Sequence, residues 1–99
     1  MIRGTTPLLG FRLPFHTENI DEVLITFAQR NKELFTVDNA ACDFDEDMVN
    51  VLLSQEQTLA LGSNAYVDVQ FRIVDTRGHR LASDILHIPV GRLLKDGEI

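Results

Sequence analysis

The stretch Asp43-Phe-Asp-Glu-Asp47 places four carboxylates in five positions and is the first candidate for chemistry in this 99-residue chain. Asp43, Asp45 and Asp47 match the first, third and fifth positions of a calcium-binding loop. Such a loop requires glycine at its sixth position and glutamate at its twelfth, where this chain has Met48 and Ser54. Because the stretch also runs directly into an alternating apolar segment, we expect a solvated turn between two strands, whose acids discourage edge pairing.

The three histidines do not have the spacing of a metal site. His16 lies in an expected loop, His79 in an expected hairpin turn, and His87 on the outer face of an expected strand. No two of them are four residues apart, as zinc ligands on a helix would be. His79 and His87 would be about 26 Å apart on an extended strand. We therefore interpret them as surface residues and expect neither a metal nor a cofactor.

Cys42 is the single cysteine, so the chain can form no internal disulfide. A nucleophilic cysteine needs a nearby cation or a helix N-terminus to lower its pKa, whereas the neighbours of Cys42 are Ala41 and the carboxylate Asp43. We predict a small, partly buried core residue. The chain also contains neither a G-x-S-x-G elbow nor a glycine-rich phosphate loop. No enzymatic activity is expected.

Alternation of apolar residues dominates the rest of the chain. Val67, Val69, Phe71 and Ile73 form the clearest example, with polar or amphipathic residues between them. This period of two is the spacing of a strand with one face in a core and the other in water. Residues 9–13, 23–27, 35–37, 49–53, 67–73 and 86–90 show it. These six segments predict an all-β protein.

The residues between the segments favour turns and one helix. Asn31 and Gly78 suit hairpin turns, and Pro89 suggests an edge strand or a strand end. Ser54 and Gln57 form a capping-box pattern, which predicts a short helical crossing near residues 54–61. We therefore predict an immunoglobulin-like antiparallel β-sandwich of about six to seven strands. Tyr66 has loosely the position of the corner tyrosine of that fold.

Composition limits the classes of partner. The chain has nine basic and fifteen acidic residues, a net charge of −6, and 44% hydrophobic residues, which fits one globular domain over residues 1–99. An acidic chain repels nucleic acid and anionic membrane surfaces. No apolar run approaches the roughly eighteen residues of a membrane helix, and residues 1–15 lack the apolar region of a signal peptide. We expect a protein made and kept in a cytoplasm, or assembled there into something larger.

A few apolar residues have no obvious place in the core. Leu24 lies on the outward face of the second segment, and Leu93, Leu94 and Ile99 lie in the tail after Gly91. A tail of this kind docks either on its own domain or on a neighbouring subunit. We predict that these four residues contribute to a partner interface.

Several segments, taken in order, carry a resemblance over nearly the whole chain. They are "MIRGTTP", "VLITFAQ", "VLLSQEQTLAL", "VDVQFRIVDTRG" and "LASDILHIPVGRLLKDGEI". The chain resembles proteins of similar length that are encoded in phages and prophages of Gram-positive bacteria, and it is distantly similar to the N-terminal domains of baseplate upper proteins. Those relatives often have a short turn containing glycine or asparagine where this chain has "DFDEDM". The resemblance implies a virion or tail-associated component and supplies no catalytic residues.

The resemblance leads to a functional hypothesis. We expect a non-enzymatic structural or accessory protein of a tail or baseplate, present in the host cytoplasm during assembly and then in the virion. Its partners would be other virion proteins or further copies of itself in a homo-oligomer. The alternative is a small acidic phage protein that binds and inhibits a host factor. A sugar-binding adhesion module is a third hypothesis, although such modules use exposed aromatics and this chain has no Trp and one Tyr.

Overall fold

The structure, a computed structural model, describes residues 1–95 and 97–99. Over these residues the chain is all-β, with eight strands in two antiparallel sheets. The strands are β1 Leu8–Arg12, β2 Ile20–Gln29, β3 Lys32–Asp38, β4 Cys42–Asp45, β5 Met48–Leu52, β6 Ala65–Asp75, β7 Arg80–Ala82 and β8 Leu86–Val90. The helical segments are α1 Gln55–Leu59 and two single 3-10 turns, η1 Thr17–Asn19 and η2 Asn39–Ala41.

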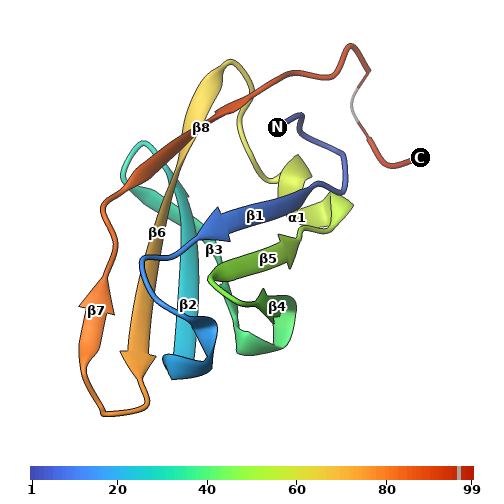
Figure 1. Cartoon of the computed structure of the whole chain (residues 1–99). Helices are drawn as coiled ribbons and strands as arrows, with labels where there is room; N and C mark the ends of the chain where they lie inside the picture. Colours follow the sequence, from blue (N-terminus) through green and yellow to red (C-terminus); the bar gives the residue numbers. More distant parts are fainter. Residues whose placement is uncertain (96) are drawn as a thin grey trace.

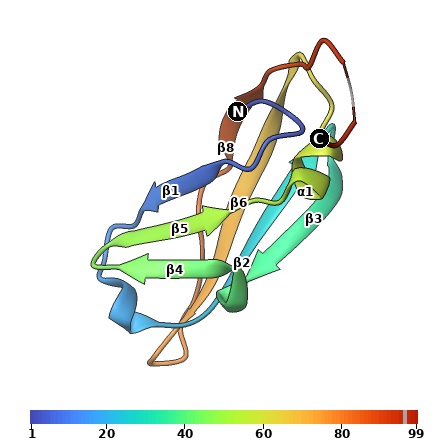
Figure 2. The same cartoon turned by 90° about the vertical axis from the view of Figure 1, so that its right-hand side faces the viewer.

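The two sheets form two layers (Figure 1). One sheet has the order β1-β5-β4, and the other has the order β3-β2-β6-β7, with β8 pairing to the first half of β6. Seen from the side, β1, β5 and β4 run across the longer β2 and β6 (Figure 2). Because β7 and β8 both pair with β6, they form one broken edge of the larger sheet.

The core lies between these layers and follows the predicted alternation. Most of the fully buried residues come from β2, β5 and β6, where they occupy alternate positions. The ring of Phe11 in β1 meets that of Phe71 in β6 edge to face, with 4.9 Å between centroids, and so joins the two sheets. Each fully buried aliphatic or aromatic side chain of this kind contributes about 1.5–3 kcal/mol.

The six predicted segments each coincide with a strand, and the all-β prediction is confirmed. Two strands were not predicted. All three residues of β7 are exposed, so no alternation marks it. The prediction that Asp43-Phe-Asp-Glu-Asp47 is simply a turn was wrong, because Asp43 and Asp45 belong to β4 and only Glu46 and Asp47 form the turn.

The crossing helix forms as predicted. The backbone N–H of Gln57 donates to Ser54 Oγ at 3.0 Å, and that of Ser54 donates to Gln57 Oε1 at 2.9 Å, which completes a capping box. Thr58 is fully buried, and its hydroxyl donates to the carbonyl of Thr5 at 2.7 Å. α1 thereby links β5 of the smaller sheet to β6 of the larger one and is fixed to the segment before β1.

The hairpin turns also agree with the sequence. Arg30 and Asn31 both have positive φ angles, of 53° and 63°, as a two-residue turn of type I′ requires. Gly78 has a φ of 84° in the β6–β7 turn. Pro89 lies in β8, which pairs with β6 and with no further strand among the described residues, so it is an edge strand, as expected.

Tyr66 does not form a tyrosine corner, so that prediction was wrong. Its side chain is 62% exposed and lies edge to face against the ring of His87. Within residues 1–95 and 97–99, no hydrogen bond from its hydroxyl is found. The side chain points to the outer face because buried Val67 follows it, and neighbouring residues of a strand point to opposite faces.

Candidate functional site

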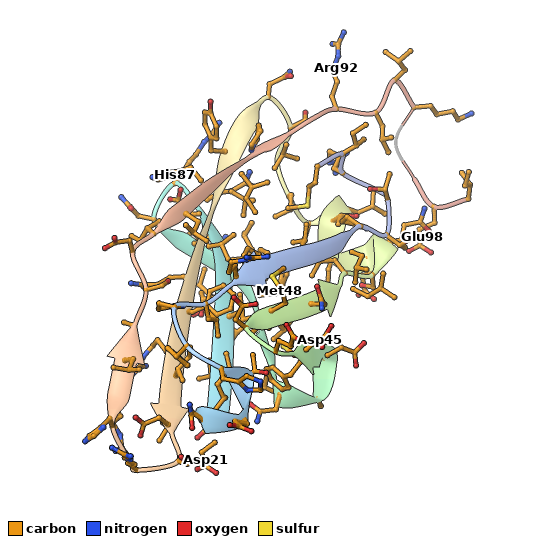
Figure 3. All side chains as sticks on the ribbon, viewed as in Figure 1. Asp21, Asp45, Met48, His87, Arg92 and Glu98 are labelled. Carbon is orange, nitrogen blue, oxygen red and sulfur yellow. The ribbon has the colours of Figure 1, made fainter. Side chains whose placement is uncertain are left out.

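The acidic hairpin holds its carboxylates apart. Asp45 pairs with Met48 across the β4–β5 turn, on the outer face of the smaller sheet (Figure 3). The turn is fixed through its backbone: the carbonyl of Glu46 accepts hydrogen bonds from the N–H and the hydroxyl of Thr17, at 2.6 and 2.7 Å. In the described part of the chain, no three His, Cys, Asp or Glu side chains gather as metal ligands. The acids therefore line an edge strand and its turn.

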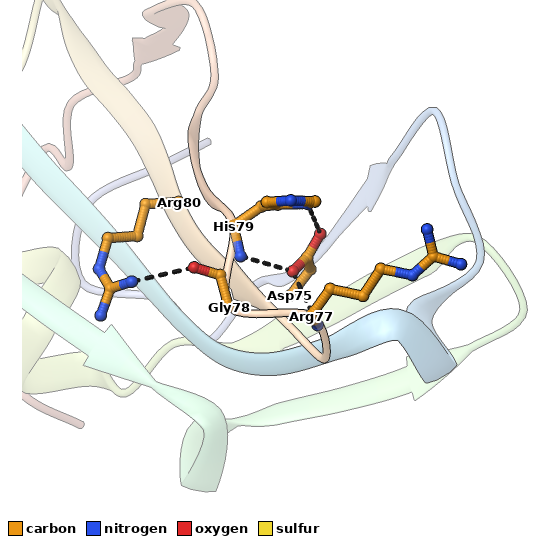
Figure 4. A network of polar contacts seen from close by, with 5 residues as sticks. All are labelled: Asp75, Arg77, Gly78, His79 and Arg80. Carbon is orange, nitrogen blue, oxygen red and sulfur yellow. Dashed lines mark hydrogen bonds and ion pairs between the residues drawn. The ribbon is translucent and has the colours of Figure 1, made fainter.

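The β6–β7 hairpin holds a network of charged and polar contacts (Figure 4). Asp75 Oδ1 accepts hydrogen bonds from the backbone N–H groups of Arg77 and His79, at 3.0 and 2.8 Å, and Oδ2 lies 3.1 Å from His79 Nδ1. Desolvation raises the pKa of Asp75, but these hydrogen bonds and the imidazole of His79 outweigh it and hold the pKa below its ordinary value. Aspartate side chains often accept hydrogen bonds from backbone N–H groups of the turn that they begin.

A surface hollow of about 370 Å³ adjoins this hairpin, between it and the segment before β2. Its lining includes Phe15, Asn19, Asp75 and His79. A carboxylate and an imidazole side by side are groups that catalytic sites use. However, both oxygens of Asp75 are already used to hold the turn, and His79 is mostly exposed. The arrangement is accounted for by the folding of the hairpin.

The structure places the three histidines in three separate settings. His87 Nδ1 lies 2.6 Å from Asp68 Oδ1, across the β6–β8 pair and on the outer face. His16 accepts a hydrogen bond from the backbone N–H of Glu18 and begins η1. His79 contacts Asp75, as described above. Each histidine thus has a local structural contact of its own.

Cys42 is half-buried at the start of β4, in agreement with the prediction. Burial raises the pKa of its thiol, and the carboxylates of Asp38 and Asp43 raise it further. Its Sγ donates to the carbonyl of Asp38 at 3.3 Å. The effect of Asp43 was expected from the sequence, whereas that of Asp38 arises because η2 folds the chain back.

The predicted interface residues do not come together on one surface. Leu24 is half-buried on the outer face of β2. Leu93 packs against Gly4, where a Cβ atom would lie only 2.5 Å from Leu93 Cδ1. Leu94 and Ile99 are fully exposed in the tail, which Arg92 and Glu98 mark in Figure 3. The tail therefore docks on its own domain through Leu93 and leaves two apolar side chains in solvent, and the partner role of the four residues stays a prediction.

The unpaired side of β1 was not anticipated from the sequence. The N–H of Leu13 donates to Asp47, and the carbonyl of Pro7 accepts from Leu53, which sets the alternation along the β1–β5 pair. Every second residue of β1 therefore bonds to β5, and the backbone groups of Leu8, Gly10 and Arg12 face away from it. We call these groups the β1 edge. Within the described residues, β1 pairs with β5 alone.

The surroundings of the β1 edge are apolar and open. Leu8 and Leu52 are cross-strand partners on the outer face, 66% and 64% exposed. On the inner side, a cavity of about 280 Å³ opens between the segment after β1 and β7, with Phe71 among its lining residues. The two sheets are therefore packed less tightly where the chain leaves β1. The order of strands in a sheet cannot be derived from each strand's own sequence, so the unpaired side of β1 was not predicted.

Comparisons of the chain with protein-family models, with curated protein sequences and with solved structures found no match. In the described part of the chain, no helix has the length and apolar character needed to cross a membrane. The candidate site therefore rests on its own geometry.

Proposed function

We propose that the chain is a non-enzymatic structural or accessory protein of a phage or prophage, a tail or baseplate component that acts by protein–protein association. The observation that carries the associative part is the β1 edge, with its unpaired backbone groups beside the exposed Leu8 and Leu52. Unpaired strand edges and contiguous exposed apolar residues are the features through which sheets take up partners. Leu94 and Ile99 in the tail offer a second contact.

We also propose that the architecture is immunoglobulin-like. The sheet orders β1-β5-β4 and β3-β2-β6-β7 correspond to strands B-E-D and C′-C-F-G of that fold. The helical crossing between β5 and β6 then lies between strands E and F, where the sequence suggested it. In this correspondence the described residues contain no counterpart of strand A, the strand that would pair with β1.

The phage context is supported by the resemblance of segments such as "RGTTP", "TFAQ" and "LLKDG" to phage-encoded proteins. Proteomics of purified virions tests it directly. We expect the protein to be present in several copies per particle, in the host cytoplasm during assembly and in the finished virion. Its absence from particles of a phage that carries and expresses the gene would exclude a structural role.

The alternative is an acidic phage protein that binds and inhibits a host factor. The net charge of −6 and the placement of Asp43 and Asp45 on an edge strand favour a basic partner surface. Affinity capture from host lysate separates the two proposals. One stoichiometric host partner, together with absence from virions, would favour inhibition.

A further inference from the structure

The edges of the two sheets differ in how well they are protected. β4 carries the outward-facing Asp43 and Asp45, and β3 carries charges at both of its ends. β8 contains Pro89, and beyond it the backbone of Gly91 hydrogen-bonds to Met1 and Arg3. Charges, proline and covering segments are the devices that block strand pairing. β1 has none of them except the single charge of Arg12.

We infer that a second copy of this chain adds to the β1 edge, antiparallel to β1, on a two-fold axis that passes through Gly10. This inference rests on the proposed associative function, for which it specifies a second copy as the partner and the β1 edge as the site. Both smaller sheets would become one continuous sheet, from β4 of one copy to β4 of the other. A symmetric dimer of this kind is the commonest form of homo-oligomer.

The backbone register supports this symmetry. The free groups belong to Leu8, Gly10 and Arg12, which are spaced evenly about Gly10. With the axis at Gly10, Leu8 of each copy lies opposite Arg12 of the other, and the two Gly10 residues lie opposite each other. Each of these pairs can exchange two hydrogen bonds, so that every free group along the edge is satisfied.

The side chains fit the same arrangement. On the inner face, Leu9 would lie opposite Phe11 of the second copy, and both are only partly buried in the single chain. Apolar cross-strand pairs of this type stabilise a sheet. On the outer face, Gly10 has no side chain, and Met48 and Asn50 cover it, since their atoms lie 3.2 and 3.1 Å from where a Cβ would be. Glycine at this position leaves room for these two side chains of the same chain, and it places no side chain at the two-fold axis.

Charge favours a second copy along this edge over the acidic β4 edge. Each copy has a net charge of −6, so contact along the acidic β4 edge would bring like charges together. At the β1 edge, the carboxylate of Asp47 lies 3.9 Å from the Nε of Arg12, so the positive charge of Arg12 offsets it. The acidic strand β4 lies two strands away, about 10 Å, which is close to the screening length at physiological salt. Two copies therefore meet with less repulsion at β1 than at β4.

Light scattering after size exclusion, over a range of protein concentrations, tests the dimer and its register. We expect the unaltered chain to dimerise, and Leu8→Lys to weaken the dimer by about fivefold or more, because the new lysine faces Arg12 of the other copy twice. The double variant Leu8→Lys with Arg12→Glu should restore the dimer, because opposite charges then face each other. Ile85→Lys, which alters an exposed residue between β7 and β8, is the control and should leave the dimer unchanged.

Leu8 is 66% exposed, and the contact of Arg12 with Asp47 is a long one of 3.9 Å between exposed side chains. At dilutions at which every protein is monomeric, all variants should therefore unfold near the temperature of the unaltered chain, which thermal unfolding verifies. An unaltered chain that stays monomeric at every concentration overturns the inference. A dimer that Leu8→Lys leaves intact but that Leu94→Lys, at the tail contact, dissociates also overturns it. Failure of the double variant to restore the dimer overturns the register. These results are distinct from the result that would exclude the proposed function, which is the absence of the protein from virions.

Discussion

Asp75 shows how a single carboxylate can look catalytic and yet serve the fold. It lies beside His79 and a surface hollow, but its two oxygens hold the backbone and the imidazole of its own hairpin. From the sequence, Gly78 indicated the turn, but the role of Asp75 in holding it was not predicted. Aspartate is nevertheless a preferred residue at the start of a turn. Cys42 is similar, because its burial and its acidic neighbours disfavour the reactive thiolate.

The lowered pKa of Asp75 predicts how the stability of the hairpin depends on pH. Because the pKa is lower in the folded chain than the ordinary 3.8, the ionised carboxylate stabilises the fold above that value. This contribution is lost as the pH falls through the folded pKa. Thermal unfolding of Asp75→Asn should show a lower unfolding temperature than the unaltered chain at neutral pH, and the difference should shrink in acid. A difference that stays constant with pH would contradict the role of the charge.

The raised pKa of Cys42 predicts slow alkylation. At neutral pH, iodoacetamide should modify the folded chain more slowly than it modifies a free cysteine, because less of the thiol is ionised. Asp38→Asn should accelerate the reaction only in part, since burial is the largest cause and Asn can still accept the hydrogen bond from Ala40. Equal rates for the folded chain and a free cysteine would show that neither burial nor charge acts on the thiol.

Among the strands, those with one buried face were predictable from the sequence, and those without a buried face were not. β5 and β6 alternate between buried and outward-facing residues, and their period of two is plain in the sequence. β7 has three exposed residues, and β4 is so acidic that it looked like a turn. Both strands form because their backbones hydrogen-bond to a neighbouring strand, β5 or β6. The local sequence does not show which strand will be the neighbour.

The capping box makes α1 the element whose stability is easiest to predict. Ser54→Ala removes the side chain that accepts from Gln57 and should lower the free energy of unfolding by about 1 kcal/mol. Ser54→Thr keeps the acceptor and serves as the control. Urea unfolding of the three proteins measures the difference. An unchanged midpoint for Ser54→Ala would mean that tertiary contacts, such as that of Thr58 with Thr5, hold the helix alone.

At the scale of the molecule, the candidate binding surface depends on sheet order, which the sequence did not determine. The sequence predicted exposed leucines in the tail and at Leu24, and the structure places these apart. The β1 edge becomes visible only when β1 is found to pair, within the described residues, with β5 alone. The unpaired side of β1 is the feature on which the proposed associative function rests.

Amide hydrogen exchange along β1, measured at low and at high protein concentration, is the most direct test of that account. The amides of Leu9 and Phe11 face β5, so they should be protected at both concentrations. The amides of Leu8, Gly10 and Arg12 should exchange rapidly when the chain is dilute and become protected as it associates. Equal, rapid exchange of these three amides at both concentrations, in a chain that does associate, would contradict pairing at the β1 edge.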